Sequence, residues 1–206
     1  MKRRKLLFLV LAAVLGLGAL LALQIVVGGV ISRAAWENRP TLSPTDAFFA
    51  DVALELGDLP QGWRRGGVMV ESVPNAEGRF YRFYGTANRS ESWINVGQII
   101  LLYPDVAAAR VGYQEQDRQY IPPTATQWRE MEELAFAHQA DEWHAECLPH
   151  SINGSPGFGC RAIARYENLV IVMLGNVFEE RWLSMADFRT VLEAMDRRAT
   201  AALEGD

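Results

Sequence analysis

Carboxylate, imidazole and thiol side chains gather in one short stretch of the second half of the sequence. Residues 141–147 read Asp-Glu-Trp-His-Ala-Glu-Cys, and His138 and His150 lie on either side of them. These side-chain types are common zinc ligands, and a histidine beside a carboxylate can also act as a general acid or base. One hypothesis is therefore a metal-dependent hydrolase that uses His144 and Glu146.

A second interpretation makes the same stretch one strand of a hairpin. The chain has two cysteines, Cys147 and Cys160, and antiparallel pairing of these two fixes the register of their strands. That register sets two acid–arginine pairs and one large–small apolar pair across the strands, which are Glu146–Arg161, Glu142–Arg165 and Trp143–Ala164. Opposed charges and packed pairs stabilise a hairpin. We therefore favour a disulfide between paired strands and expect neither a metal site nor a cofactor.

The residues between the two cysteines, 148–159, predict a 12-residue loop closed by the disulfide. This loop carries Ile152 and Phe158 where turns are usually polar, together with His150. One hypothesis is that these three residues form a pre-ordered tip that binds a partner. The alternative is that the apolar pair folds back over the edge of the core, as loops of this length often do.

Signatures of other enzyme classes are missing from the sequence. It contains no Gly-x-Ser-x-Gly and no Gly-x-Gly-x-x-Gly, and its only lysines are Lys2 and Lys5. A Schiff base, a Walker-type phosphate loop and a Ser-x-x-Lys nucleophile all require a lysine in the folded domain, and the sequence has none after Lys5. We therefore expect a protein that is not an enzyme.

The N-terminal part predicts a membrane anchor. Residues 2–5 are Lys-Arg-Arg-Lys, and residues 6–31 form an apolar run whose only strongly polar side chain is Gln24. As a helix this run would be about 39 Å long, enough to cross the apolar core of a bilayer, and it is longer than the core of a cleaved signal peptide. Cleavage near Ser32-Arg33-Ala34 remains the alternative.

The distribution of charge orients this anchor. Basic residues favour the cytoplasmic side, so we expect a cytoplasmic tail (1–5), a transmembrane signal anchor (6–31), a linker (32–43) and an extracytoplasmic domain (44–206) at the bacterial cell membrane. Residues 32–206 hold 16 basic and 25 acidic side chains, which argues against nucleic-acid binding. Two cysteines in such a compartment are expected to form a stable disulfide.

The expected partners are the lipid bilayer and a protein in or at the membrane. A stripe of small residues in the predicted span would allow another span to pack closely, with a glutamine beside it. An accessory subunit of a larger membrane complex is therefore an alternative to an independent binding module. The residues that would pack in this way are Ala12, Gly16, Ala19, Ala22 and Gln24.

Periodicity beyond the linker predicts an α+β domain. The pattern indicates an antiparallel sheet covered by helices, with strands followed by a helix in each half. The helices are expected at 43–56 (with Phe48, Val52 and Leu56 on one face), 106–120 (with Val106, Ala109 and Tyr113 inward) and from the cap Ser184 onward. The strands are expected at 68–73, 79–85, 93–103, 134–139, 142–147, 160–166 and 169–174.

Two stretches carry a resemblance to known proteins. They are Leu101-Leu102-Tyr103-Pro104-Asp105 followed by Val106 to Arg110, and Asn168-Leu-Val-Ile-Val172 followed by the terminal helix. This pattern resembles extracytoplasmic domains of bacterial lipoproteins and sensor ectodomains of bacterial serine/threonine kinases, over about residues 45–203. The resemblance implies a non-catalytic α+β domain that binds a ligand or a partner.

Overall fold

The computed structural model describes residues 44–71, 75–86, 96–121, 127–152, 155–178 and 183–205. The predicted anchor at 6–31, its packing residues and the linker lie outside the described residues. No helix within these ranges is both long enough and apolar enough to cross a membrane.

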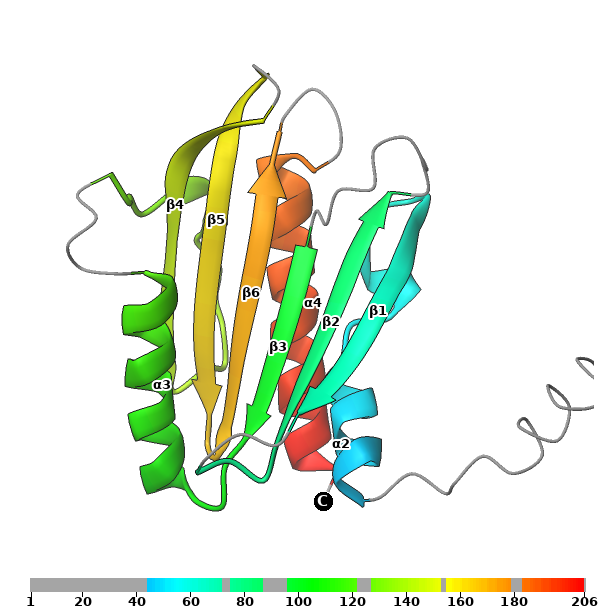
Figure 1. Cartoon of the computed structure of the whole chain (residues 1–206), viewed down its shortest axis with the longest axis vertical. Coiled ribbons are helices and arrows are strands. Elements are labelled where there is room, and N and C mark those ends of the chain that lie inside the picture. The colour runs from blue at the N-terminus through cyan, green and yellow to red at the C-terminus, as the bar shows by residue number, and fades with distance from the viewer. Residues whose placement is uncertain are drawn as a thin grey trace, which may run out of the picture. The chain divides into compact units, whose positions relative to one another are not determined.

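Six antiparallel strands form one sheet in the order β1-β2-β3-β6-β5-β4 (Figure 1). Three of them precede α3 and three precede α4, so the element order of the first half recurs in the second, as predicted. The α+β class and the antiparallel sheet covered by helices are therefore confirmed. The strands are β1 (Trp63–Glu71), β2 (Gly78–Thr86), β3 (Val96–Leu102), β4 (Glu142–Ile152), β5 (Ser155–Tyr166) and β6 (Leu169–Val177).

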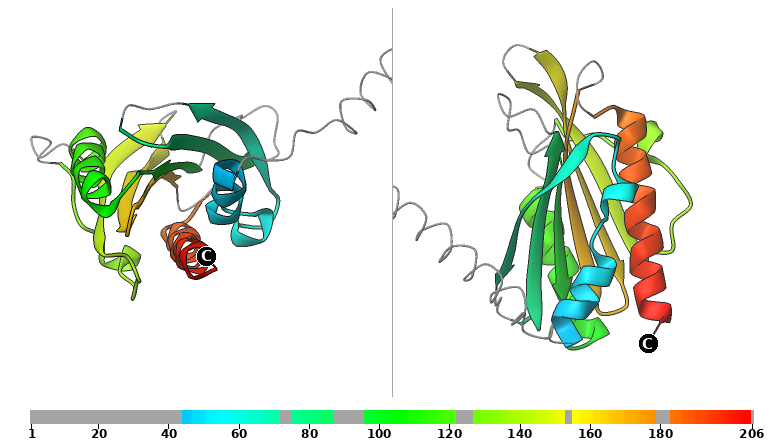
Figure 2. Two further views of the ribbon diagram at one scale, coloured as in Figure 1. Left: turned by 90° about the horizontal axis from the view of Figure 1, so that it is seen from below. Right: turned by 90° about the vertical axis from the view of Figure 1, so that its right-hand side faces the viewer.

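Helices pack on both faces of the sheet. Figure 2 shows α3 (Val106–Tyr120) on one face, with α2 (Pro44–Val52) and α4 (Met185–Glu204) together on the other. Two buried clusters correspond to these faces, one containing Phe188 and Leu192 of α4 and the other containing Tyr113 of α3. Strand β3 and its neighbour β6 are therefore apolar on both sides, as central strands should be.

Capping side chains set the first residues of two helices where the sequence predicts them. The Asp105 carboxylate accepts a hydrogen bond from the Ala108 amide at 2.8 Å and begins α3. At α4, Ser184 and Asp187 form a reciprocal capping box. Each cap satisfies amides that have no partner within the helix, so short side chains alone set these boundaries.

The first helix is shorter than predicted because buried polar groups capture its end. It ends at Val52 rather than at Leu56, which lies half exposed in the 3-10 turn η1 (Leu56–Asp58). The Leu54 amide donates to the side chain of Gln98 at 3.0 Å, and the Tyr84 hydroxyl donates to the Leu54 carbonyl at 3.0 Å. Both side chains come from the sheet, so only the tertiary structure stops the helix here.

Two further predictions are wrong. The segment predicted as a strand at 134–139 begins with the last residue of the 3-10 turn η2 (Glu132–Leu134) and then runs without a strand partner among the described residues. Its Gln139 amide donates to the buried Asp196 carboxylate on α4 instead of to a neighbouring strand. On α3, Val106 is 45% exposed, because the inward face runs through Ala109, Gly112 and Tyr113.

The predicted 12-residue loop is also wrong. Strand pairing continues from Leu148 opposite Gly159 to Ile152 opposite Ser155, so only residues 153 and 154 lie between the strands. Those two residues are Asn-Gly, the pair most typical of two-residue hairpin connections. The apolar residues that argued against a tight turn are therefore strand residues.

Candidate functional site

The disulfide and the predicted register of its hairpin are both confirmed. Cys147 is bonded to Cys160 and lies directly opposite it, with a Cα–Cα distance of 4.0 Å. Every predicted opposition, from Glu142–Arg165 to Glu146–Arg161, is present in the ladder. Both cysteines are buried in the core on the α4 side of the sheet.

Arg165 is the buried centre of an ion-pair network at the start of this hairpin. Its side chain is 5% exposed, and it donates to Glu142 at 2.6 Å and to Asp141 at 3.0 Å. It also donates to the Glu167 carbonyl at 2.9 Å. The pairing of Glu142 with Arg165 that the register predicts is therefore confirmed.

The second predicted ion pair does not form, although its residues lie opposite each other. Glu146 lies 3.2 Å from Nε2 of His144 instead. Arg161 donates to the Cys160 carbonyl and lies over the ring of Trp128, 5.9 Å from its centroid. Burial lowers the pKa of this guanidinium, which the neighbouring tyrosine hydroxyls Tyr120 and Tyr81 partly offset.

His144 lies between two carboxylates at the contact of α3 with β4. Its Nδ1 is 2.5 Å from Asp117 of α3, and its Nε2 faces Glu146 on its own strand. Burial by itself would lower the pKa of His144, but its hydrogen bonds to Asp117 and Glu146 and their charges together raise it above the ordinary value. The imidazole ring therefore joins the helix to the strand.

This geometry opposes a metal site at His144 and Glu146. The two nitrogens of an imidazole point away from each other, so Asp117 and Glu146 contact opposite edges of the ring and cannot share one ion with it. No group of three or more ligand-type side chains converges anywhere in the described part of the chain. The hydrolase hypothesis also requires a free thiol at Cys147, and that sulfur is in the disulfide.

The predicted partner-binding residues lie on an arm of the same hairpin. Beyond Phe158, which pairs with Val177 of β6, strand β5 is bonded only to β4, and Figure 1 shows this part projecting past the end of the sheet. His150 is exposed on the arm, with its ring centroid 6.5 Å from that of Phe178. Phe158 is partly buried and packs against the core at the base of the arm, and Ile152 is a strand residue near the tip.

A hollow of about 620 Å³ lies between α2 and the end of α4. Phe48, Leu102 and Leu203 supply apolar lining, and Arg198 supplies the single positive charge. That charge is already bound by Asp58 and Glu55. Among its described lining residues the hollow therefore offers no uncompensated positive charge, and its other charged residue is Asp51.

Sequence reasoning missed the surface at the opposite edge of the sheet. Residues 64–69 of β1 are all exposed, and they include Arg64, Arg65, Val68 and Met69. One available signal was the concentration of four arginines in β1 and β2, within a domain that is otherwise strongly acidic.

Comparison with known proteins gives one distant match. No protein-family model matches the chain, and no curated protein matches its sequence. Its structure is similar to the extracellular domain of PknH from Mycobacterium tuberculosis, with a TM-score of 0.46 and 9% sequence identity, covering 77% of this chain and 93% of that one. This likeness is too distant to transfer a functional residue, a ligand or a partner to this chain.

Proposed function

We propose that this protein is a membrane-anchored, extracytoplasmic binding domain without catalytic activity, and that the β4–β5 arm recognises its partner. The observation that carries the proposal is an arm of the hairpin, residues 147–160, that has no Asp, Glu, Lys or Arg, is crosslinked at its base by Cys147–Cys160 and projects from an acidic domain. The buried disulfide supports an oxidising compartment, and the apolar run at 6–31 supports an anchor.

The arm has the physical properties of a pre-organised recognition element. Residues 147–160 contain no aspartate, glutamate, lysine or arginine, so binding would not require the desolvation of a fixed charge. Two-stranded hairpins are marginal in isolation, and the disulfide joins the two strands of this one two residues before the pairing with β6 ends. Holding the bound conformation in advance lowers the entropic cost of association.

Site-specific photo-crosslinking in native membranes tests the arm. A benzophenone side chain at Ser151 or Pro156, both exposed on the arm, should give an adduct of defined mass. The same group at Val111, exposed on α3, is the matched control and should give none. The adduct should weaken when both cysteines are replaced by serine. Equal labelling from position 111 would contradict recognition by the arm.

The accessory-subunit hypothesis predicts a different result in the same membranes. Native mass measurement after mild detergent extraction should yield the protomer alone or with one partner if the protein is an independent binding module. Constant co-migration with a large complex would favour the accessory subunit. Thiol titration of the unreduced protein tests the compartment, because we expect no free thiol, whereas a titratable thiol would contradict an oxidising environment.

A further inference from the structure

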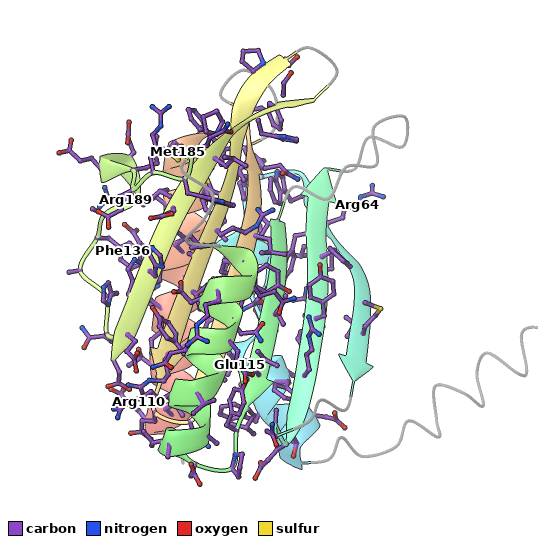
Figure 3. All side chains as sticks on the ribbon, turned by 60° about the vertical axis from the view of Figure 1, so that its left-hand side comes forward. Arg64, Arg110, Glu115, Phe136, Met185 and Arg189 are labelled. Atoms are coloured by element: carbon purple, nitrogen blue, oxygen red, sulfur yellow. A yellow bond between two sulfur atoms is a disulfide. The ribbon has the colours of Figure 1, made fainter. Side chains whose placement is uncertain are left out.

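The two edge strands of the sheet differ in whether other backbone pairs with their outer sides. At the β4 edge, Arg129 and Cys147 exchange two backbone hydrogen bonds of 3.0 and 2.9 Å, so the segment before β4 covers part of it. At the β1 edge, no strand or bridge of the described ranges pairs with the outer side of β1. Figure 3 shows Arg64 at this open edge and Phe136 beyond the covered one. An open edge presents unpaired backbone donors and acceptors to another strand.

The side chains along the open edge are arranged alike on both faces. A bulge between Arg65 and Val68 keeps these two residues on the α4 face, where they oppose Tyr84 and Arg82. Arg64 and Met69 lie on the α3 face. Val68 is 46% exposed and Met69 is 49% exposed. Each face of the edge therefore offers one arginine and one accessible apolar side chain to an added strand.

The charge of this edge is opposite to that of the domain around it. Strands β1 and β2 hold four arginines and one glutamate, whereas the remainder of residues 44–206 holds ten arginines and 23 acidic residues. Arg82 lies over the ring of Phe80, 4.9 Å from its centroid, rather than against a carboxylate. On other elements, Arg165 and Arg198 are bound by carboxylates of this chain.

We infer that the β1 edge binds an extended acidic segment of a protein partner, which adds to the sheet as a seventh strand. Backbone hydrogen bonds would supply the affinity, and the arginines would select carboxylates. A second copy of this chain would bring the same positive pair of strands, so charge disfavours self-association here. This surface lies at the opposite edge from the β4–β5 arm, and its test does not depend on the proposed role of that arm.

Binding of designed peptides to the full chain in neutral detergent tests the inference. A fluorescent peptide that alternates Glu and Val should bind, and one that alternates Lys and Val should not. N-methylation removes backbone donors, and in an added strand only alternate donors face β1. Because both faces of the edge offer the same side-chain types, either alternate set can face β1, so methylating both sets should abolish binding, while methylating one set should not. Full retention of binding by the fully methylated peptide would overturn strand addition.

A charge-matched pair of variants locates the site. Arg64→Glu with Arg65→Glu should weaken binding of the acidic peptide by about tenfold or more. Arg118→Glu with Arg197→Glu changes the net charge equally at exposed residues of α3 and α4, and it should leave binding unchanged. Equal loss in both variants would overturn a local site. A dimer that the first variant abolishes would assign the edge to a second copy, and displacement of the peptide by anionic vesicles would assign it to lipid.

Discussion

Arg165 illustrates how a single charge joins the two strands of the hairpin. The side chain is nearly buried, but Asp141 and Glu142 remain 48% and 30% exposed, so their charges stay partly solvated. Removing one partner of a fully buried ion pair typically costs about 3–5 kcal/mol, and the exposure of these carboxylates reduces that cost. The contribution of Arg165 to stability should therefore lie between those of a surface pair and a buried pair.

We expect Arg165→Met to lower the free energy of unfolding by about 2 kcal/mol, because it leaves two carboxylates beside an apolar side chain. Urea denaturation with the disulfide intact measures this change. Arg189→Met is the matched control, since it removes an exposed i,i+4 pair with Glu193 and should cost about 0.3–0.5 kcal/mol. Equal losses in the two variants would contradict a special role of burial.

His144 should make stability depend on pH in a defined direction. Its pKa is raised in the folded protein, so its contribution is complete below the unfolded pKa of about 6.5 and is lost as the pH rises through the folded pKa. Replacing His144 with Gln should therefore destabilise the protein more at about pH 5.5 than at about pH 8.5. Urea denaturation at the two pH values checks this difference.

Asp117→Asn provides the control for that pH dependence. This variant removes the charge at Nδ1 of His144 but keeps a side chain of the same size. In the Asp117→Asn background, His144→Gln should therefore destabilise the protein by nearly the same amount at the two pH values. If the difference persists unchanged, Asp117 is not its source.

At the scale of elements, α3 is positioned by a close approach to the sheet. Gly112 faces Tyr103, which follows β3, and a β-carbon at position 112 would overlap the tyrosine ring. A glycine within a helix costs about 1 kcal/mol relative to alanine, so propensity alone would favour the substitution. Overpacking costs about 1–3 kcal/mol, and this larger steric cost should decide the outcome.

We therefore expect Gly112→Ala to lower the free energy of unfolding by up to about 2 kcal/mol. Val111→Ala, at the exposed neighbouring position, should change it by less than about 0.5 kcal/mol. Thermal and urea denaturation of the two variants give the comparison. A more stable Gly112→Ala variant would mean that the helix can move away from Tyr103 at little cost.

At the scale of the whole molecule, the distribution of charge predicts an orientation. The basic residues 2–5 precede the apolar run, and the acidic domain follows it. We expect a reporter that is active only outside the cytoplasm to be active when it is fused after Asp206. Fusion after Lys5 is the control and should be inactive. Activity of a strictly cytoplasmic reporter after Asp206 would contradict the orientation.

Some features of the β4–β5 hairpin could be predicted from the sequence, and others could not. The cysteine pairing and register could be predicted, because strand pairing has a period of two and one alignment satisfied the disulfide, the charges and the packing. The predicted length of the connection was wrong, although Asn153-Gly154, the pair most typical of two-residue connections, was an available signal in the sequence. The engagement of Glu146 by His144 instead of Arg161 depends on α3, which brings Asp117 to the same ring.

Sequence alone determined the features that depend on local patterns. These are the helix caps at Asp105 and Ser184, the α+β class and the succession of strands followed by a helix in each half, because short-range spacing and chemistry set them. The tertiary structure alone decided which charges find partners. It placed Asp117 against His144, ended α2 with a hydrogen bond to Gln98, and left β1 without a strand partner on its outer side among the described residues. Such contacts join residues far apart in the chain, and their formation depends on how elements pack rather than on local propensity.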